Sequence, residues 1–140
     1  MSVWQELTPE FVDFIPEDLE DGVLYVSMEY TTAVHLCACG CGLKVITPIS
    51  PAQWRLTYDG RVSLYPSVGS WDLVCDSHYW IIKNHVEWVP PWTKKQVETG
   101  RNRDRAALEE QYQPPVMTER APTLARLRST FRRWTGRRLL

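Results

Sequence analysis

The fold is decided by the stretch Trp54-Arg55-Leu56-Thr57-Tyr58-Asp59-Gly60-Arg61-Val62-Ser63-Leu64-Tyr65. Two runs rich in strand-favouring residues flank the Asp-Gly pair at its centre. This dipeptide supplies the positive φ angles that a two-residue turn needs, so the stretch predicts a β-hairpin.

The segments on either side of this hairpin also predict β structure. Residues 78–83 and 85–89 form a second expected hairpin about Asn84, and shorter strands are expected over 11–15, 24–28, 33–36 and 44–47. Residues 16–22 resemble a turn of helix that ends at glycine. Short strands with frequent turns predict a mainly β fold, a small sandwich or barrel.

All four cysteines lie in two short segments, His35-Leu36-Cys37-Ala38-Cys39-Gly40-Cys41-Gly42 and Cys75-Asp76-Ser77-His78. Tetrahedral zinc takes thiolate and imidazole donors at about 2.0–2.3 Å, and two close groups on separate loops can supply four of them. We therefore predict a metal site with the candidate ligands Cys37, Cys39, Cys41, Cys75 and His78. His35 is expected to support the ligands, and buried free thiols are the alternative interpretation.

Zinc is the expected metal, because the candidates are numerous enough to close the site and no other redox feature is present. The alternative cofactor is a [2Fe–2S] cluster, since a Rieske-type centre takes two Cys and two His from two loops and Cys75-x-x-His78 fits half of that pattern. A closed zinc site would stabilise a small β domain with limited core area. An open metal position would instead indicate a metalloenzyme or a redox protein.

The sequence predicts no catalytic residues. Ser67 and Ser77 are potential nucleophiles, but neither lies in a Gly-x-Ser-x-Gly elbow, and His78 is occupied if it binds metal. A cysteine of the cluster that binds no metal would be an alternative nucleophile, as a thiolate. The pattern therefore favours a binding or adaptor protein over an enzyme.

The cysteine segments belong to a longer pattern that includes Trp54-x-Leu56-Thr57, Pro66-Ser67-x-Gly69-x-Trp71 and Cys75-x-Ser77-His78-Tyr79-Trp80-Ile81. Over residues 22–89 this pattern resembles a small family of uncharacterised bacterial and phage proteins. Some members are encoded beside ubiquitin-like conjugation genes (E1-like, E2-like and deubiquitinase-like) in settings linked to phage defence. The resemblance implies a metal-binding domain that is accessory to such a system, with a protein partner.

Charge divides the chain into two unequal parts. Residues 1–93 have a net charge of −8 and residues 94–140 a net charge of +7. The second part predicts a helix over 93–112 and another from Pro122 that carries Leu124, Leu127, Phe131 and Trp134 on one face. We therefore divide the chain into a metal-binding β domain, 1–92, and a basic helical extension, 93–140. The extension is expected to contact a protein, a nucleic acid or an anionic membrane surface.

No apolar run reaches the roughly 18 residues of a spanning helix, and the first residues lack the basic and apolar regions of a signal peptide. We therefore expect a cytoplasmic protein with reduced cysteines.

Overall fold

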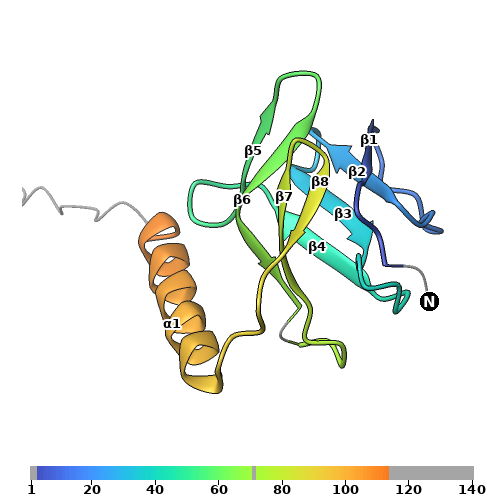
Figure 1. Cartoon of the computed structure of the whole chain (residues 1–140). Coiled ribbons are helices and arrows are strands. Elements are labelled where there is room, and N and C mark those ends of the chain that lie inside the picture. The colour runs from blue at the N-terminus through green and yellow to red at the C-terminus, as the bar shows by residue number, and fades with distance from the viewer. Residues whose placement is uncertain (1–2, 71, 114–140) are drawn as a thin grey trace, which may run out of the picture.

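The computed structural model describes residues 3–70 and 72–113 and shows two four-stranded sheets followed by one helix (Figure 1). The first sheet has the order β1 (Thr8–Phe11), β2 (Val23–Ser27), β3 (Thr32–Leu36), β4 (Lys44–Pro48). The second has the order β5 (Arg55–Tyr58), β6 (Val62–Gly69), β7 (His78–Ile82), β8 (His85–Trp88). Only the β1–β2 pair is parallel. The prediction of a mainly β fold is confirmed.

The two sheets enclose one hydrophobic core. Burial alternates along β4 and the first part of β6, as the two-residue period of a strand requires, whereas β2 and β3 are buried along most of their length. Fully buried side chains come from both sheets, among them Val26, Ala33, Leu64, Tyr79 and Ile81. The N-terminal segment links the sheets, because the Leu7 N–H donates to the Asn84 carbonyl in the second sheet immediately before β1 begins.

Both predicted hairpins form, with small differences at their ends. The turn after β5 contains Asp59 and Gly60, and β6 continues to Gly69 because β7 pairs with its other edge. Between β7 and β8 the turn consists of Lys83 and Asn84, with φ angles of 48° and 71°. Both residues have a left-handed backbone conformation, as a tight hairpin turn requires.

The strand expected over residues 11–15 is displaced, because β1 covers Thr8–Phe11 instead. Beyond it the Ser27 hydroxyl donates to the Asp13 carbonyl at 2.8 Å, so a side chain takes the place of the strand ladder. The helical turn expected over 16–22 is absent from the structure. Its backbone groups bind other partners, since the Glu17 carbonyl accepts from Lys44 Nζ at 2.8 Å.

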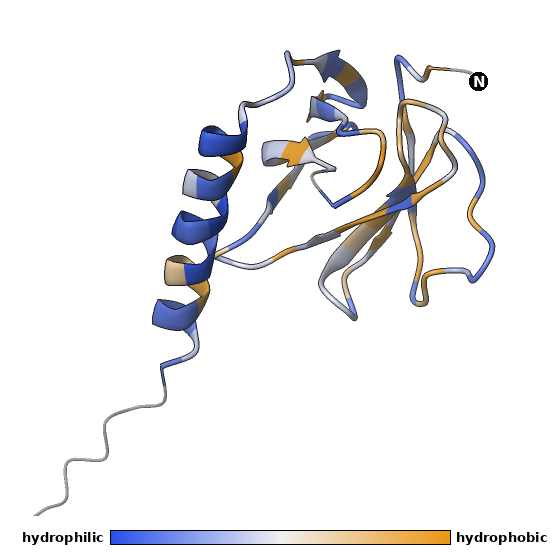
Figure 2. Ribbon diagram, turned by 90° about the horizontal axis from the view of Figure 1, so that it is seen from below, coloured by the Kyte–Doolittle hydropathy of each residue, from blue (hydrophilic) through white to orange (hydrophobic). Residues whose placement is uncertain are grey.

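The predicted helix over 93–112 is confirmed as α1 (Lys94–Gln111). Thr93 begins it with a capping box, in which its hydroxyl accepts the Gln96 N–H while the Gln96 side chain accepts the Thr93 N–H. The helix has no buried residue and is almost entirely hydrophilic (Figure 2). The second expected helix, from Pro122, lies outside the described residues.

In the described part of the chain, no helix is both long enough and apolar enough to cross a membrane.

Candidate functional site

The four cysteines converge at one end of the sandwich. Their sulfur atoms all lie within 4.8 Å of one another, and the Sγ atoms of Cys37 and Cys75 are 3.7 Å apart. Cys37 is buried, whereas Cys39, Cys41 and Cys75 are half-buried. Four of the five predicted ligands are thus brought together from two loops.

The first loop follows β3 and turns back sharply into β4. The Cys37 N–H donates to the Leu43 carbonyl at 2.8 Å, and the Gly40 N–H donates to the Cys37 carbonyl at 3.0 Å. Gly40 has a φ of 84°, a conformation that glycine adopts without strain. This turn directs three closely spaced cysteines toward one point.

The second loop lies between β6 and β7. Backbone hydrogen bonds from Leu73 to Ser70 and from Asp76 to Leu73 coil it, and the Ser70 N–H to Ser77 carbonyl bond of 2.8 Å closes it. Cys75 projects from this coil toward the first loop, as its 3.7 Å approach to Cys37 shows. Sheet pairing of β6 with β7 therefore determines where the fourth sulfur lies.

The donor set fits a single tetrahedral ion. Metal–sulfur bonds of about 2.3 Å in a tetrahedron place the sulfurs about 3.8 Å apart, close to the Cys37–Cys75 separation. Burial raises the pKa of Cys37, and it raises that of Cys41 to about 12. Burial also disfavours the Cys39 thiolate, but hydrogen bonds from Ser77 and Cys41 outweigh it and lower the pKa of Cys39 to about 7. The cluster could hold a metal ion.

His35 lies beside the cluster and is fully buried in the core. Its Nε2 is 2.8 Å from the Tyr79 hydroxyl, which in turn lies 3.9 Å from Cys37 Sγ and accepts the Ala38 N–H at 3.3 Å. Burial lowers the pKa of His35 to about 4, so its ring is neutral. Tyr79 thus links His35 to Cys37, and the supporting role of His35 stays a prediction.

His78, the fifth predicted ligand, lies outside the group of four sulfurs. It begins β7 and faces away from the core, because its neighbour Tyr79 faces inward. Its Nε2 is 2.7 Å from Ser67 Oγ on β6. The structure therefore pairs His78 with one of the two serines noted in the sequence.

The surroundings of His78 hold its ring in place. The imidazole is 2% exposed, and the Trp92 ring packs edge-to-face on it at 4.9 Å between centroids. Burial lowers the pKa of His78, and a hydrogen bond with the backbone of Pro90 opposes this effect. A neutral imidazole in hydrogen-bond contact with a serine hydroxyl is the arrangement of a nucleophile and its general base.

A family model described as "Bacterial ubiquitination-like system serine protease (BubE)" matches residues 11–89. The chain belongs to the BubE family. The match covers β2 to β8, and with them both cysteine loops, Ser67 and His78. It confirms the link to bacterial ubiquitin-like conjugation that the motifs indicated, whereas α1 lies beyond the match. Searches of curated proteins and of solved structures found no match.

The Ser67–His78 pair is the feature that sequence reasoning missed. Ser67 lies in a strand rather than in a strand–turn–helix elbow, so the familiar signature is absent. Its only signal was its position in Pro66-Ser67-x-Gly69-x-Trp71, a motif of the shared pattern.

Proposed function

We propose that this chain is a serine protease of a bacterial ubiquitination-like system, with Ser67 as nucleophile and His78 as general base. The observation that carries the proposal is the 2.7 Å contact between Ser67 Oγ and His78 Nε2. The family description supports it independently, because it names a serine protease of such a system. A protein component of that system is the proposed substrate.

The reaction follows from the two side chains. His78 accepts the hydroxyl proton as Ser67 Oγ bonds to the carbonyl carbon, and it then gives that proton to the leaving amine as the peptide bond breaks. Water hydrolyses the resulting ester in a second round of the same transfers. Burial supports the first step, since a lowered pKa keeps His78 neutral and able to accept a proton at neutral pH.

The hydrogen bond to the Pro90 backbone supports His78 in a second way. In many serine proteases a carboxylate orients the histidine and stabilises its charged form. The Pro90 backbone raises the pKa of His78 in the same direction as such a carboxylate would. Contact with the Trp92 ring, roughly perpendicular to the imidazole, further limits its rotation.

Reaction with a fluorophosphonate probe tests the nucleophile, because such probes label serines that a base activates. Peptide mapping should place the label on Ser67, and Ser67→Ala and His78→Ala should abolish it. Ser63→Ala is the matched control, since Ser63 lies on the same strand and its hydroxyl accepts the exposed Lys83 N–H rather than contacting a histidine. Absence of label on the wild-type chain, or label that persists in Ser67→Ala, would reject the proposal.

We also propose that Cys37, Cys39, Cys41 and Cys75 bind zinc in a closed, structural site. Such an ion would fix the two loops to each other, and with them the start of β7, where His78 lies three residues after Cys75. The compact sulfur group favours one ion over a [2Fe–2S] cluster, whose two irons divide the ligands between them. A reducing cytoplasmic location suits these thiols. About one zinc per chain and no visible absorption would support the assignment, whereas iron with acid-labile sulfide would overturn it.

Adaptor binding is a second proposal, and α1 is the observation that favours it. This helix has no buried residue and exposes most of its side chains, and it lies beyond the residues that match the family. We propose a division into a β domain, 1–92, and a partner-binding extension, 93–140. If the function is binding alone, Ser67→Ala will retain full activity in the host system, whereas a protease will lose it.

A further inference from the structure

Strand β6 has an open edge at its second half. Its pairing with β5 ends at Tyr65, opposite Arg55. Its register with β7 shifts between Leu64 and Val68, and Val68 and Gly69 then pair with β7 on one side. On the other side of this half, no strand within the described residues adds to it. Ser67 lies in this half. An open strand edge is a template on which an extended peptide can add main-chain hydrogen bonds.

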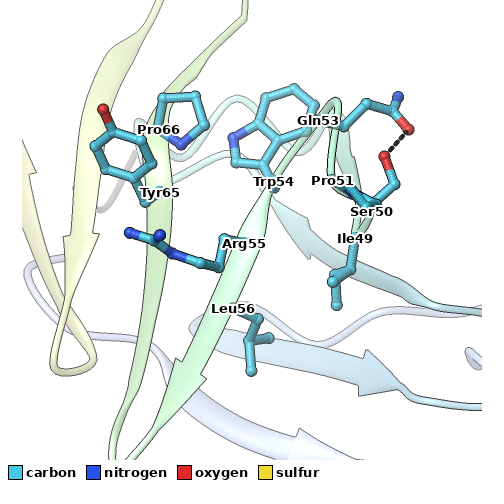
Figure 3. A pocket seen from close by; sticks show the side chains of 9 residues that line it. All are labelled: Ile49, Ser50, Pro51, Gln53, Trp54, Arg55, Leu56, Tyr65 and Pro66. Carbon is cyan, nitrogen blue, oxygen red and sulfur yellow. Dashed lines mark hydrogen bonds between the residues drawn. The ribbon is translucent and has the colours of Figure 1, made fainter. Parts of the chain in front are cut away.

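A cavity of about 620 Å³ lies next to this edge (Figure 3). Its volume falls within the roughly 300–1,000 Å³ that is typical of ligand sites. Pro66, which directly precedes Ser67, forms part of its wall, together with the apolar side chains of Ile49, Trp54, Leu56 and Tyr65. The cavity therefore suits a bulky aliphatic side chain close to the nucleophile.

A second, smaller cavity adjoins the first one on the side of α1. Its volume is about 210 Å³, and it shares Trp54 and Pro66 with the first. Asp104 and Leu108 of α1 line its other side. A peptide chain along the β6 edge would thus run between the loop before β5 and the helix.

Arg55 provides a positive charge at the larger cavity. Its guanidinium lies 5.2 Å from the centre of the Tyr65 ring, and it forms no ion pair with a carboxylate of the described residues. It is one of only four basic side chains in residues 1–93, where the net charge is −8. An unpaired cation in an acidic surface complements a carboxylate on the ligand.

Trp54 adds a hydrogen-bond donor. Its Nε1–H is buried and has no acceptor among the described residues. Figure 3 shows the indole nitrogen on the side of Pro66 and Arg55, where the cavity lies. A main-chain carbonyl of a bound peptide would supply the missing acceptor, which a buried N–H normally has.

We infer that this cavity and the Pro66–Gly69 edge form the substrate cleft, and that it binds an extended segment with a bulky aliphatic residue and a nearby carboxylate. The inference rests on the proposed protease function, because it places the scissile bond beside Ser67. Arg55 is then a specificity-determining residue rather than a catalytic one.

Cleavage of a peptide library by the full-length, metal-loaded chain tests the inference. Aliphatic residues together with Asp or Glu should be enriched within about three positions of the cleaved bonds. Changing the acidic residue of a good peptide to Lys should lower kcat/KM at least tenfold for the wild type. Arg55→Glu should reverse this preference, so that the Lys peptide becomes the better substrate.

Arg61→Glu is the matched control, because it makes the same charge change in an exposed residue at the far end of the same hairpin. It should keep the wild-type preference. The inference is overturned if Arg55→Glu and Arg61→Glu prefer the same peptides, or if Arg55→Glu cleaves neither peptide. It is also overturned if the probe labels Ser67 of the wild type while the wild type shows no preference between the peptides or cleaves none of them. Absence of both cleavage and labelling would mean that the protease function itself has failed.

Discussion

Tyr79→Phe removes one hydroxyl from the centre of the sandwich and should be unusually costly. Tyr79 is fully buried, and its hydroxyl joins the two sheets by binding His35 of β3 at 2.8 Å. It also accepts the Ala38 N–H at 3.3 Å. Phe fills the same space, so no cavity contributes to the loss. Each buried polar group left without a partner costs about 1–3 kcal/mol, so with two such groups we expect a loss of about 2–6 kcal/mol.

That loss is a large fraction of the stability of a small domain, about 5–15 kcal/mol. It corresponds to a fall in Tm of about 10–30 °C. Urea unfolding of the metal-loaded protein, followed by tryptophan fluorescence, measures it. Tyr25→Phe is the matched control, because Tyr25 is also a buried residue and, among the described residues, its hydroxyl accepts one weak bond, from the Glu20 N–H at 3.3 Å.

A double mutant isolates the hydrogen bond from other effects. His35→Leu with Tyr79→Phe removes both partners, so the two changes together should cost less than the sum of the single changes by about 0.5–3 kcal/mol. Equal losses for Tyr79→Phe and Tyr25→Phe, or strict additivity with His35→Leu, would refute the reasoning.

Three further predictions concern the metal, the base and a close contact. Stripping the metal with a chelator should lower Tm strongly, because the proposed ion would join two loops. An unchanged Tm after verified metal removal would contradict a structural site. For proteolysis, kcat/KM should stay high at neutral pH and fall on the acid side with an apparent pKa below 6.5. The reason is that burial lowers the pKa of His78 and only its neutral form accepts a proton. A midpoint above 6.5 in the pH–rate profile would exclude His78 as the base. Gly22→Ala should cost more than Gly60→Ala in urea unfolding. At both positions φ is positive, which costs an alanine about 1–2 kcal/mol. At Gly22 the new Cβ would in addition lie 2.7 Å from the Trp4 ring, whereas at Gly60 it would meet nothing within 4 Å. Equal losses of stability would disprove the contact with Trp4.

The buried contact between Tyr79 and His35 and the proposed catalytic pair, Ser67 and His78, share one structural element. β7 carries Tyr79 inward to His35 and the cysteine cluster, and its neighbour His78 outward to Ser67. Because successive residues of a strand face opposite sides, a change in the register of β7 would disturb both at once. This coupling explains how a metal at Cys75 would support a serine on another strand.

Local patterns predicted the elements whose hydrogen bonds are local. The Asp59-Gly60 turn, the hairpin at Asn84 and the capped helix from Thr93 need only neighbours in the chain, so their residues specify them directly. The strand over 11–15 was misplaced because Asp13 binds Ser27, a residue that no local pattern connects with it.

For the site, residue type and spacing by themselves predicted that the cysteines form a cluster, since soft donors grouped on two loops have few other uses. Residue type and spacing also favoured His78 as a metal ligand, because a Cys-x-x-His spacing is typical of paired metal ligands. Only the tertiary structure decided its actual neighbour. Sheet pairing turns Tyr79 into the core and His78 out of it, and it brings β6 alongside, so that Ser67 rather than a sulfur lies 2.7 Å from the imidazole. The contact between Ser67 and His78 depends on the face of the sheet to which each side chain points. For His78 this face is determined by burial of its neighbour Tyr79, because successive strand residues point to opposite faces.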